Sequence, residues 1–197
     1  MSKILNQIAT YRGTDKSAEI HNYCDKYEKY LPFKRTDEIN IIEIGVLNGD
    51  SLRTWKDYFI KANILGIDIN PDCKQYEGPR MSVEIGSQFD KNFLFLTANH
   101  YGPFDMILDD GSHINSDVIF SFDHLFDSLK SGGVYVIEDC TTSYWGDYGG
   151  GFRKEGTPVE YCKDLVDNVN FNGLIYYPEE GDGNLNRNDY SKKRILK

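Results

Sequence analysis

Two groups of carboxylate residues follow apolar runs that have the composition of buried strands. The first, Asp109-Asp110-Gly111-Ser112-His113, comes directly after residues 104–108. The second, Glu138-Asp139, comes directly after residues 134–137. The carboxyl ends of neighbouring parallel strands form ligand sites in open α/β sheets. Acids gathered at one place repel one another unless a cation or a proton lies between them. The two groups therefore predict a metal-assisted site with a histidine beside it.

The predicted metal ligands are Asp110, Glu138 and Asp139, because carboxylate oxygens suit Mg²⁺ or another hard divalent cation rather than zinc. His113 follows Asp110 by three residues. A tight turn would bring its ring over a bound hydroxyl, where an imidazole can act as general base. Alternation along the strand points Asp109 away from Asp110, so we expect it to support the cofactor end of the site. Taken singly, each residue also fits a plainer explanation, such as a helix cap, an Asx turn or a surface histidine.

A glycine-containing turn predicts the cofactor half of the site. The first strand runs into Glu43-Ile44-Gly45-Val46-Leu47-Asn48-Gly49, which lacks the full G-x-G-x-x-G fingerprint of dinucleotide sites. Gly45 and Gly49 would let the backbone turn sharply and approach a ligand. Asp68 ends the second strand, where an acid can accept both hydroxyls of a ribose. This combination favours S-adenosylmethionine over NAD, although an ordinary strand-to-helix turn with an N-capping Asp is the plainer explanation.

Ser87 and Gln88 follow the third predicted strand, at the place where an adenine ring would lie. Either side chain could hydrogen-bond the base. Either could instead cap the next helix.

Strands and helices alternate along the chain, which predicts an α/β fold with a doubly wound, mainly parallel sheet of the Rossmann-like kind. Strands are expected at 39–46, 64–69, 81–85, 106–108 and 134–137, and helices near 50–59, 90–96, 118–129 and 159–169. The turn Ser131-Gly132-Gly133 should end the third of these helices. We expect a single domain over 1–197, with residues 1–36 as a helical cap in two pieces.

Composition limits the classes of partner. The 197-residue chain has a formal net charge of -9 and a pI near 4.9, so its general field should not attract nucleic acid or an anionic membrane. No apolar run reaches the roughly 20 residues of a membrane helix, and the first residues lack a signal-peptide pattern. Four scattered cysteines read as reduced thiols. We therefore expect a cytoplasmic protein.

An aromatic, glycine-containing segment follows the second acidic group. Within Thr141–Gly151, the side chains of Tyr144, Trp145 and Tyr148 could line the mouth of an acceptor site. The glycines predict a mobile lid. The alternative is an aromatic loop anchored in the core.

At these motifs the chain resembles the metal-dependent class I methyltransferases that act on macrolide sugars, the mycinamicin and macrocin O-methyltransferase type, with cephamycin-pathway relatives. The resemblance is carried by Gly13-Thr14-Asp15-Lys16 and by residues 43–49, 66–69, 109–113 and 136–145. It implies S-adenosylmethionine on Gly45, Asp68 and the Ser87-Gln88 turn, Mg²⁺ on Asp110, Glu138 and Asp139, and His113 as general base. It also implies that the Gly-Thr-Asp-Lys segment helps to close the site, and it suggests homo-oligomers.

The chain departs from this family near its C-terminus. Class I methyltransferases usually finish with a sixth and a seventh strand, whereas residues 171–197 hold one convincing apolar run at 174–177 and a short one at 195–196. We expect either a truncated chain or an edge supplied by a partner.

The sequence therefore predicts an S-adenosylmethionine-dependent, Mg²⁺-assisted O-methyltransferase. Its expected acceptor is a hydroxyl of a sugar, in a surface polysaccharide or another glycan, or in a glycosylated small molecule. Two alternatives stay open: an NAD-dependent oxidoreductase on the same fold, and a non-catalytic subunit that binds S-adenosylmethionine.

Overall fold

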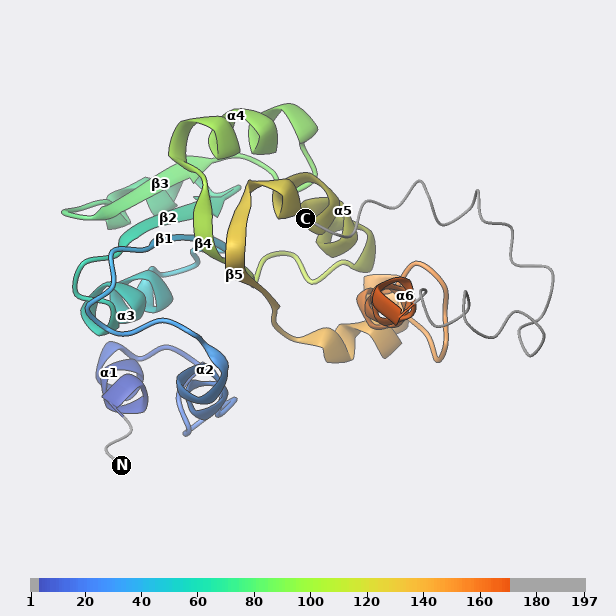
Figure 1. The fold of residues 1–197 in the computed structure, drawn as a ribbon, viewed down its shortest axis with the longest axis horizontal. Helices are drawn as coiled ribbons and strands as arrows, with labels where there is room; N and C mark the ends of the chain where they lie inside the picture. The colour runs from blue at the N-terminus through green and yellow to red at the C-terminus, as the bar shows by residue number, and fades with distance from the viewer. Residues whose placement is uncertain (1–3, 171–197) are drawn as a thin grey trace.

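A five-stranded parallel sheet forms the centre of the computed structural model, which describes residues 4–170 (Figure 1). The strands are β1 Asn40–Ile44, β2 Asn63–Asp68, β3 Met81–Ile85, β4 Phe104–Asp109 and β5 Leu129–Ile137. Their spatial order is β3-β2-β1-β4-β5, and every pairing is parallel. The order reverses between β1 and β4, which is the point where doubly wound sheets bind ligands. The predicted Rossmann-like architecture is confirmed.

Helices cover both faces of this sheet. One face carries α1 Ile4–Arg12, α2 Cys24–Tyr30 and α3 Asp50–Tyr58, and the other carries α4 Lys91–Tyr101 and α5 Asn115–Leu125 (Figure 1). Successive strand residues point to opposite faces. Ile41 accordingly packs in the first core and Ile42 in the second. The inner strands β1, β2 and β4 are therefore buried from both sides, which explains why they are mainly apolar in sequence.

The N-terminal helices pack on the same core as α3. Trp55 of α3 is fully buried, and its ring meets that of Tyr27 edge-on at a centroid distance of 4.9 Å. Arg12, at the end of α1, donates through Nε to Asp57 at 2.7 Å. These contacts hold the segment between α1 and α2 beside the carboxyl ends of the strands.

The main departure from the predicted elements lies after α5. This helix ends at Leu125, a short 3-10 turn covers Phe126–Ser128, and Leu129 opens β5. The sequence predicted a helix through 129, stopped by Ser131-Gly132-Gly133. Helical spacing misled here because Leu129 pairs with Phe104 at the start of β4, so the chain must already be extended at that position.

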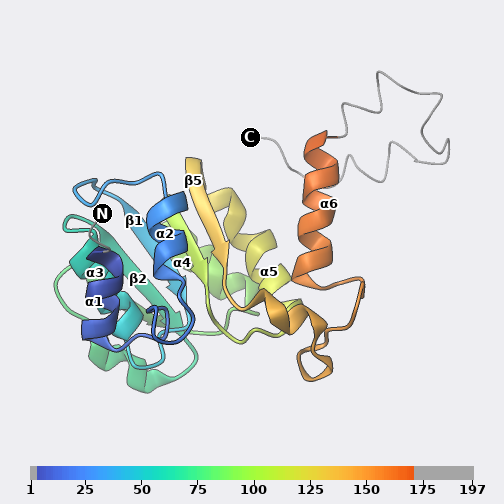
Figure 2. The same cartoon turned by 90° about the horizontal axis from the view of Figure 1, so that it is seen from below.

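The remaining helix, α6 Pro158–Asn170, stands beyond α5 at the β5 end of the molecule (Figure 2). Within residues 4–170, β4 is the only strand that pairs with β5. The expected runs at 174–177 and 195–196 lie outside the described residues. Among the helices of the described part, none has the length and apolar character needed to cross a bilayer.

Candidate active site

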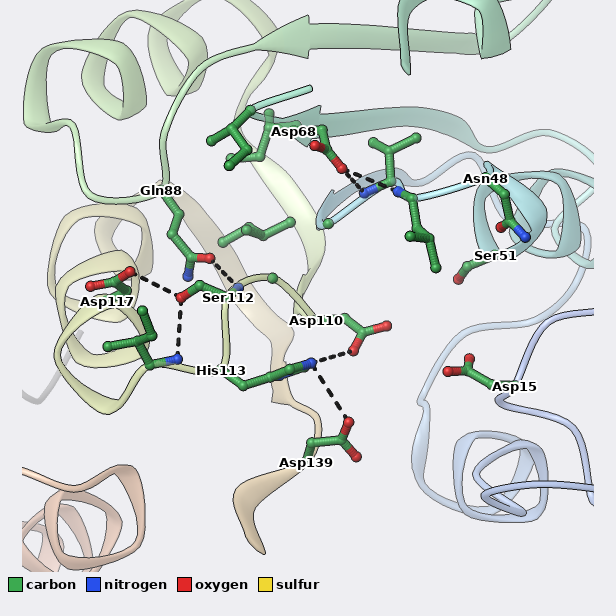
Figure 3. Close-up of a pocket in the computed structure, with 18 of the residues that line it drawn as sticks. Asp15, Asn48, Ser51, Asp68, Gln88, Asp110, Ser112, His113, Asp117 and Asp139 are labelled. Atoms are coloured by element: carbon green, nitrogen blue, oxygen red, sulfur yellow. Dashed lines mark hydrogen bonds and ion pairs between the residues drawn. The ribbon is translucent and has the colours of Figure 1, made fainter. Parts of the chain in front are cut away.

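The carboxyl ends of β1, β2, β3 and β4 surround a cavity of about 620 Å³ (Figure 3). Its lining includes seven residues predicted for the site, namely Gly45, Asp68, Ser87, Gln88, Asp110, His113 and Asp139. Three other predicted residues, Gly49, Asp109 and Glu138, are not among the lining residues. The structure thus gathers most of the predicted cofactor and metal residues around one space.

Gly45 brings two strand ends together. Its φ is +92°, and a Cβ added there would lie 2.2 Å from the carbonyl oxygen of Asp110. Only glycine combines that backbone conformation with so close an approach. The cofactor turn after β1 and the acidic turn after β4 are therefore in direct contact.

Three residues other than glycine adopt left-handed conformations around the cavity. Leu47, His113 and Asp139 have φ values of 51°, 57° and 50°. Such conformations cost free energy in residues that carry a Cβ, and they concentrate at functional sites. Two of the three, His113 and Asp139, are predicted members of the chemical site.

Asp68 is tied to the cofactor turn. Its Oδ2 accepts the N–H groups of Val46 and Leu47 at 2.8 and 3.1 Å, and Oδ1 accepts that of Asn70 at 2.8 Å. Burial alone would raise its pKa, but these three backbone donors lower it below the usual value. A carboxylate offers about four lone-pair positions, and the three backbone donors together with the Cys73 thiol take up most of them. The structure therefore leaves less room for a ribose than the two hydroxyls expected from the sequence.

The other predicted cofactor residues have structural partners. Gly49 lies outside the cavity lining: it precedes α3 with a φ of 72°, and a Cβ there would meet the Tyr76 ring at 2.7 Å. Ser87 is exposed, and its Oγ accepts the N–H of Phe89 at 3.1 Å. Burial raises the pKa of Asp109 to about 7, which suits a carboxyl enclosed beneath the cavity. Asp109 is buried beside Gln88, and its supporting role stays a prediction.

A partly exposed group of side chains that we call the outer cluster, made up of Asp110, His113 and Asp139, faces the cavity (Figure 3). His113 Nε2 lies 3.8 Å from Asp110 Oδ1 and 3.7 Å from Asp139 Oδ2. The three donor atoms all lie within 4.8 Å of one another. Tyr23 donates its hydroxyl to the other oxygen of Asp139 at 2.6 Å. Ligands of one Mg²⁺ ion sit about 2.1 Å from it and therefore at most about 4.2 Å from one another, so the two carboxylates could share a hard divalent cation after a small inward movement.

A second group, the inner cluster, lies deeper between the strand ends and the N-terminal segment. Lys16, only 2% exposed, places its ammonium against Asp110 Oδ2, 2.7 Å from Glu138 Oε2 and 3.6 Å from Glu43 Oε1. The Tyr27 hydroxyl donates to the remaining oxygen of Glu138. Glu138 therefore faces Lys16 and Tyr27, and it does not join the outer cluster with Asp110 and Asp139.

The inner cluster contains three carboxyl groups and one ammonium group. Burial alone would lower the pKa of Lys16, but the carboxylates of Glu43, Glu138 and Asp110 raise it above its usual value. Burial raises the pKa of Glu43 to about 7 and that of Glu138 to about 8, and Lys16 offsets only part of this effect. Three carboxylates share one ammonium, so the cluster stays short of positive charge.

Sequence reasoning missed most of this inner cluster. For Lys16, the resemblance implied only that its segment helps to close the site. Glu43 was predicted only as part of the first strand. A glutamate inside an otherwise apolar buried strand is a signal for a buried partner, because an isolated charge there is costly. The sequence does not show that the partner comes from the N-terminal segment.

The aromatic segment after β5 is held by several backbone contacts. Asn115 of α5 donates through Nδ2 to the carbonyl of Tyr148 at 2.6 Å. A Cβ on Gly150 would lie 2.5 Å from the carbonyl oxygen of Thr142. Trp145 is half-exposed and is not among the residues that line the large cavity. These contacts hold the backbone of the loop, but Trp145 does not enter the core as the anchored-loop alternative required.

No family model matches the chain. It is 35% identical over 194 residues to mycinamicin VI 2''-O-methyltransferase of Micromonospora griseorubida, covering 93% of this chain and 48% of that protein. It is 37% identical over 175 residues to demethylmacrocin O-methyltransferase of Streptomyces fradiae, covering 84% of this chain and 44% of that protein.

A solved structure agrees with these matches. The methyltransferase MycE of the mycinamycin biosynthetic pathway, in complex with Mg, SAH and mycinamycin VI, aligns with a TM-score of 0.80 at 35% identity. The alignment covers 84% of this chain and 48% of that one. The chain thus spans about half the length of the relatives that it matches. Over that half, it is similar in sequence and in fold to the O-methyltransferases of the mycinamicin and macrocin type.

Proposed function

We propose that this protein transfers the methyl group of S-adenosylmethionine to a hydroxyl of a sugar carried by a small molecule, with the help of a divalent metal ion. The relatives at 35–37% identity are named for methylation of such glycosylated compounds. Their names favour a glycosylated small molecule over a polysaccharide as the acceptor. Homo-oligomers and a cytoplasmic location remain proposals.

The charge of the cavity is the observation that carries this proposal. Five aspartates line it, namely Asp15, Asp68, Asp110, Asp117 and Asp139. Lys16 is the only lysine or arginine among the lining residues that the structure describes, and its ammonium is already engaged with carboxylates. Such a surface attracts a sulfonium cation and repels the pyrophosphate of NAD. The oxidoreductase alternative is accordingly not favoured.

The outer cluster supplies groups for the transfer. We assign Asp110 and Asp139 as ligands of the divalent ion, which would lower the pKa of an acceptor hydroxyl that it binds. Glu138, the third predicted ligand, would first have to exchange its bond to Lys16 for the ion.

His113 is proposed as the general base. Its Nε2 faces Asp110 and Asp139, so it can take the proton of the acceptor hydroxyl as the new oxygen–carbon bond forms and the sulfur–carbon bond breaks. The two carboxylates would stabilise the imidazolium that results. In-line placement of the methyl group completes the requirement for transfer.

The test has two stages. Calorimetry should show binding of SAH by the purified protein, and activity on a glycosylated macrolide acceptor should disappear with EDTA and return with Mg²⁺. Full turnover in EDTA would rule out the metal-assisted mechanism. Binding of NAD without binding of SAH would replace the proposed activity with the oxidoreductase alternative.

A further inference from the structure

Gln88 lies at the edge of the cofactor cavity, yet its side chain turns into the protein. It follows β3, is 8% exposed and reaches across to the turn after β4 and to helix α5 (Figure 3). Its Oε1 accepts the N–H of Ser112 at 2.7 Å. Its Nε2 donates to Ser121 Oγ at 2.9 Å and contacts Asp109 Oδ1 at 3.3 Å. The Gln88 amide therefore joins the end of β4, the turn that follows it and helix α5.

The partners fix the orientation of this amide. The backbone N–H of Ser112 can only donate, so the atom that faces it must be the amide oxygen of Gln88. Ser121 donates its own hydroxyl to the carbonyl of Asp117 at 2.7 Å, so its oxygen is left to accept from Nε2. A glutamine amide carries two N–H donors, and Ser121 and Asp109 take both. No N–H of Gln88 is left to donate to the ring nitrogens of an adenine.

The turn that Gln88 holds is the one that carries His113. A Cβ on Gly111 would lie 2.1 Å from Gln88 Oε1, so the amide packs directly against the backbone of this turn. Ser112 is also fixed by its side chain, which donates to Asp117 Oδ2 at 3.0 Å and accepts the Ile114 N–H at 3.2 Å. His113 comes next, in its left-handed conformation.

We propose that Gln88 is a positioning residue for His113 rather than a ligand of the adenine. Its amide clamps the Gly111-Ser112 backbone against α5, and this clamp sets where the imidazole stands relative to Asp110 and Asp139. The inference rests on the proposed function for its catalytic meaning. The structural part, that Gln88 controls the placement of the ring, can be tested without turnover.

The direct test is the NMR signal of the His113 ring in histidine-labelled protein. The chain has four histidines, and the signal that is lost in His113→Ala identifies the one of interest. Gln88→Met keeps the length of the side chain but removes its hydrogen bonds, so the His113 signal should shift. Gln75→Met makes the same change at an exposed glutamine and should leave the signal in place. An unmoved His113 signal in Gln88→Met would overturn the proposal.

Calorimetry with SAH separates the two roles. If Gln88 positions His113, SAH affinity in Gln88→Met should stay within about twofold of wild type, while kcat falls by about tenfold or more at an unchanged KM for S-adenosylmethionine, because small misplacements of reacting groups cost large factors in rate. If Gln88 binds the adenine, SAH affinity falls and kcat at saturation is unchanged. That second pattern would also overturn the proposal.

Two further results keep the test decisive. If Gln88→Met fails to fold, Ser121→Ala takes its place, because it removes the hydroxyl that holds Nε2 and should shift the His113 signal in the same way; an unshifted signal there would count against the proposal. If wild-type protein binds no SAH and shows no turnover, the proposed function fails, but the NMR comparison still decides whether Gln88 places the ring.

Discussion

The inner and outer clusters share one aspartate and solve the same electrostatic problem differently. In the inner cluster, Oδ2 of Asp110 accepts a hydrogen bond from Lys16. In the outer cluster, Oδ1 of the same residue faces His113. The inner cluster is buried and contains the Lys16 ammonium as its cation, whereas the outer cluster is partly exposed and faces the cavity. Buried acids need a permanent partner because water cannot solvate them. Acids at the cavity edge are partly solvated, so they do not need a permanent partner and can bind a cation that arrives with the ligands.

We expect changes in the inner cluster to lower the stability of the fold, and changes in the outer cluster to lower activity or metal binding. The largest expected effect follows from His113→Ala, which should lower turnover by about 10²- to 10⁴-fold because the general base is lost. SAH affinity and melting temperature should stay close to those of wild type, because the His113 side chain is partly exposed and its two carboxylate neighbours lie 3.7 and 3.8 Å away, beyond hydrogen-bond distance. Steady-state kinetics, calorimetry and a thermal melt measure the three quantities. Normal turnover in this variant would remove His113 from its proposed role.

Lys16→Met should destabilise the fold by about 3–5 kcal/mol, because removing one partner of a buried ion pair leaves the other charges uncompensated. Urea denaturation measures the change. Lys26→Met, at an exposed position on α2, serves as control and should change stability little. Mg²⁺ should raise the melting temperature of Lys16→Met more than that of wild type, since an external cation can then reach the inner carboxylates. Wild-type stability in Lys16→Met would contradict the distinction between the clusters.

Glu43→Gln tests the shortage of positive charge in the inner cluster. The folded-state pKa of Glu43, about 7, lies above the value near 4.5 expected in the unfolded chain. Between these values the folded state keeps the proton that the unfolded state releases, so stability falls as pH rises through this window. Glutamine cannot ionise, and the variant should avoid up to about 3 kcal/mol of that fall.

Urea denaturation of wild type and Glu43→Gln at about pH 4.5 and about pH 7.5 checks this expectation. The fall that remains in the variant belongs to Glu138 and Asp109, whose pKa values are also raised by burial. Equal falls in the two proteins would show that Glu43 ionises as freely in the fold as in the unfolded chain.

Two tyrosines near α2 offer a matched pair with smaller effects. Tyr27 donates to Glu138 in the inner cluster, and Tyr23 donates to Asp139 in the outer one. Tyr27→Phe should cost about 1–3 kcal/mol of stability, because it leaves a buried carboxylate oxygen without its donor. Tyr23→Phe should leave stability nearly unchanged and weaken divalent-ion binding about tenfold, as the loss of an outer hydrogen bond to a ligand does. Mn²⁺ titration and urea denaturation distinguish the two variants. A loss of stability in Tyr23→Phe together with weaker ion binding in Tyr27→Phe would contradict the distinction between the clusters.

The outer cluster follows from local sequence, whereas the inner one does not. Apolar runs identified β4 and β5, and the residues directly after them had to stand at neighbouring strand ends, so Asp110 and Asp139 were predictable. Lys16 meets Glu138 across 122 residues of sequence, and no periodicity reports so distant a pairing. The same limit applies to Gln88, which the sequence placed beside the cofactor but whose amide is directed by Ser112 and Ser121 from other elements.

Gly45 offers a way to sort related sequences before any experiment. A methyl group at this position would occupy the space of a carbonyl oxygen on the neighbouring turn. The turn after β1 and the turn after β4 would then have to separate, and the distance between the proposed cofactor end and the proposed metal end of the site would grow. Related sequences with any side chain at this position should therefore lack the proposed activity, even where every carboxylate and the histidine are retained.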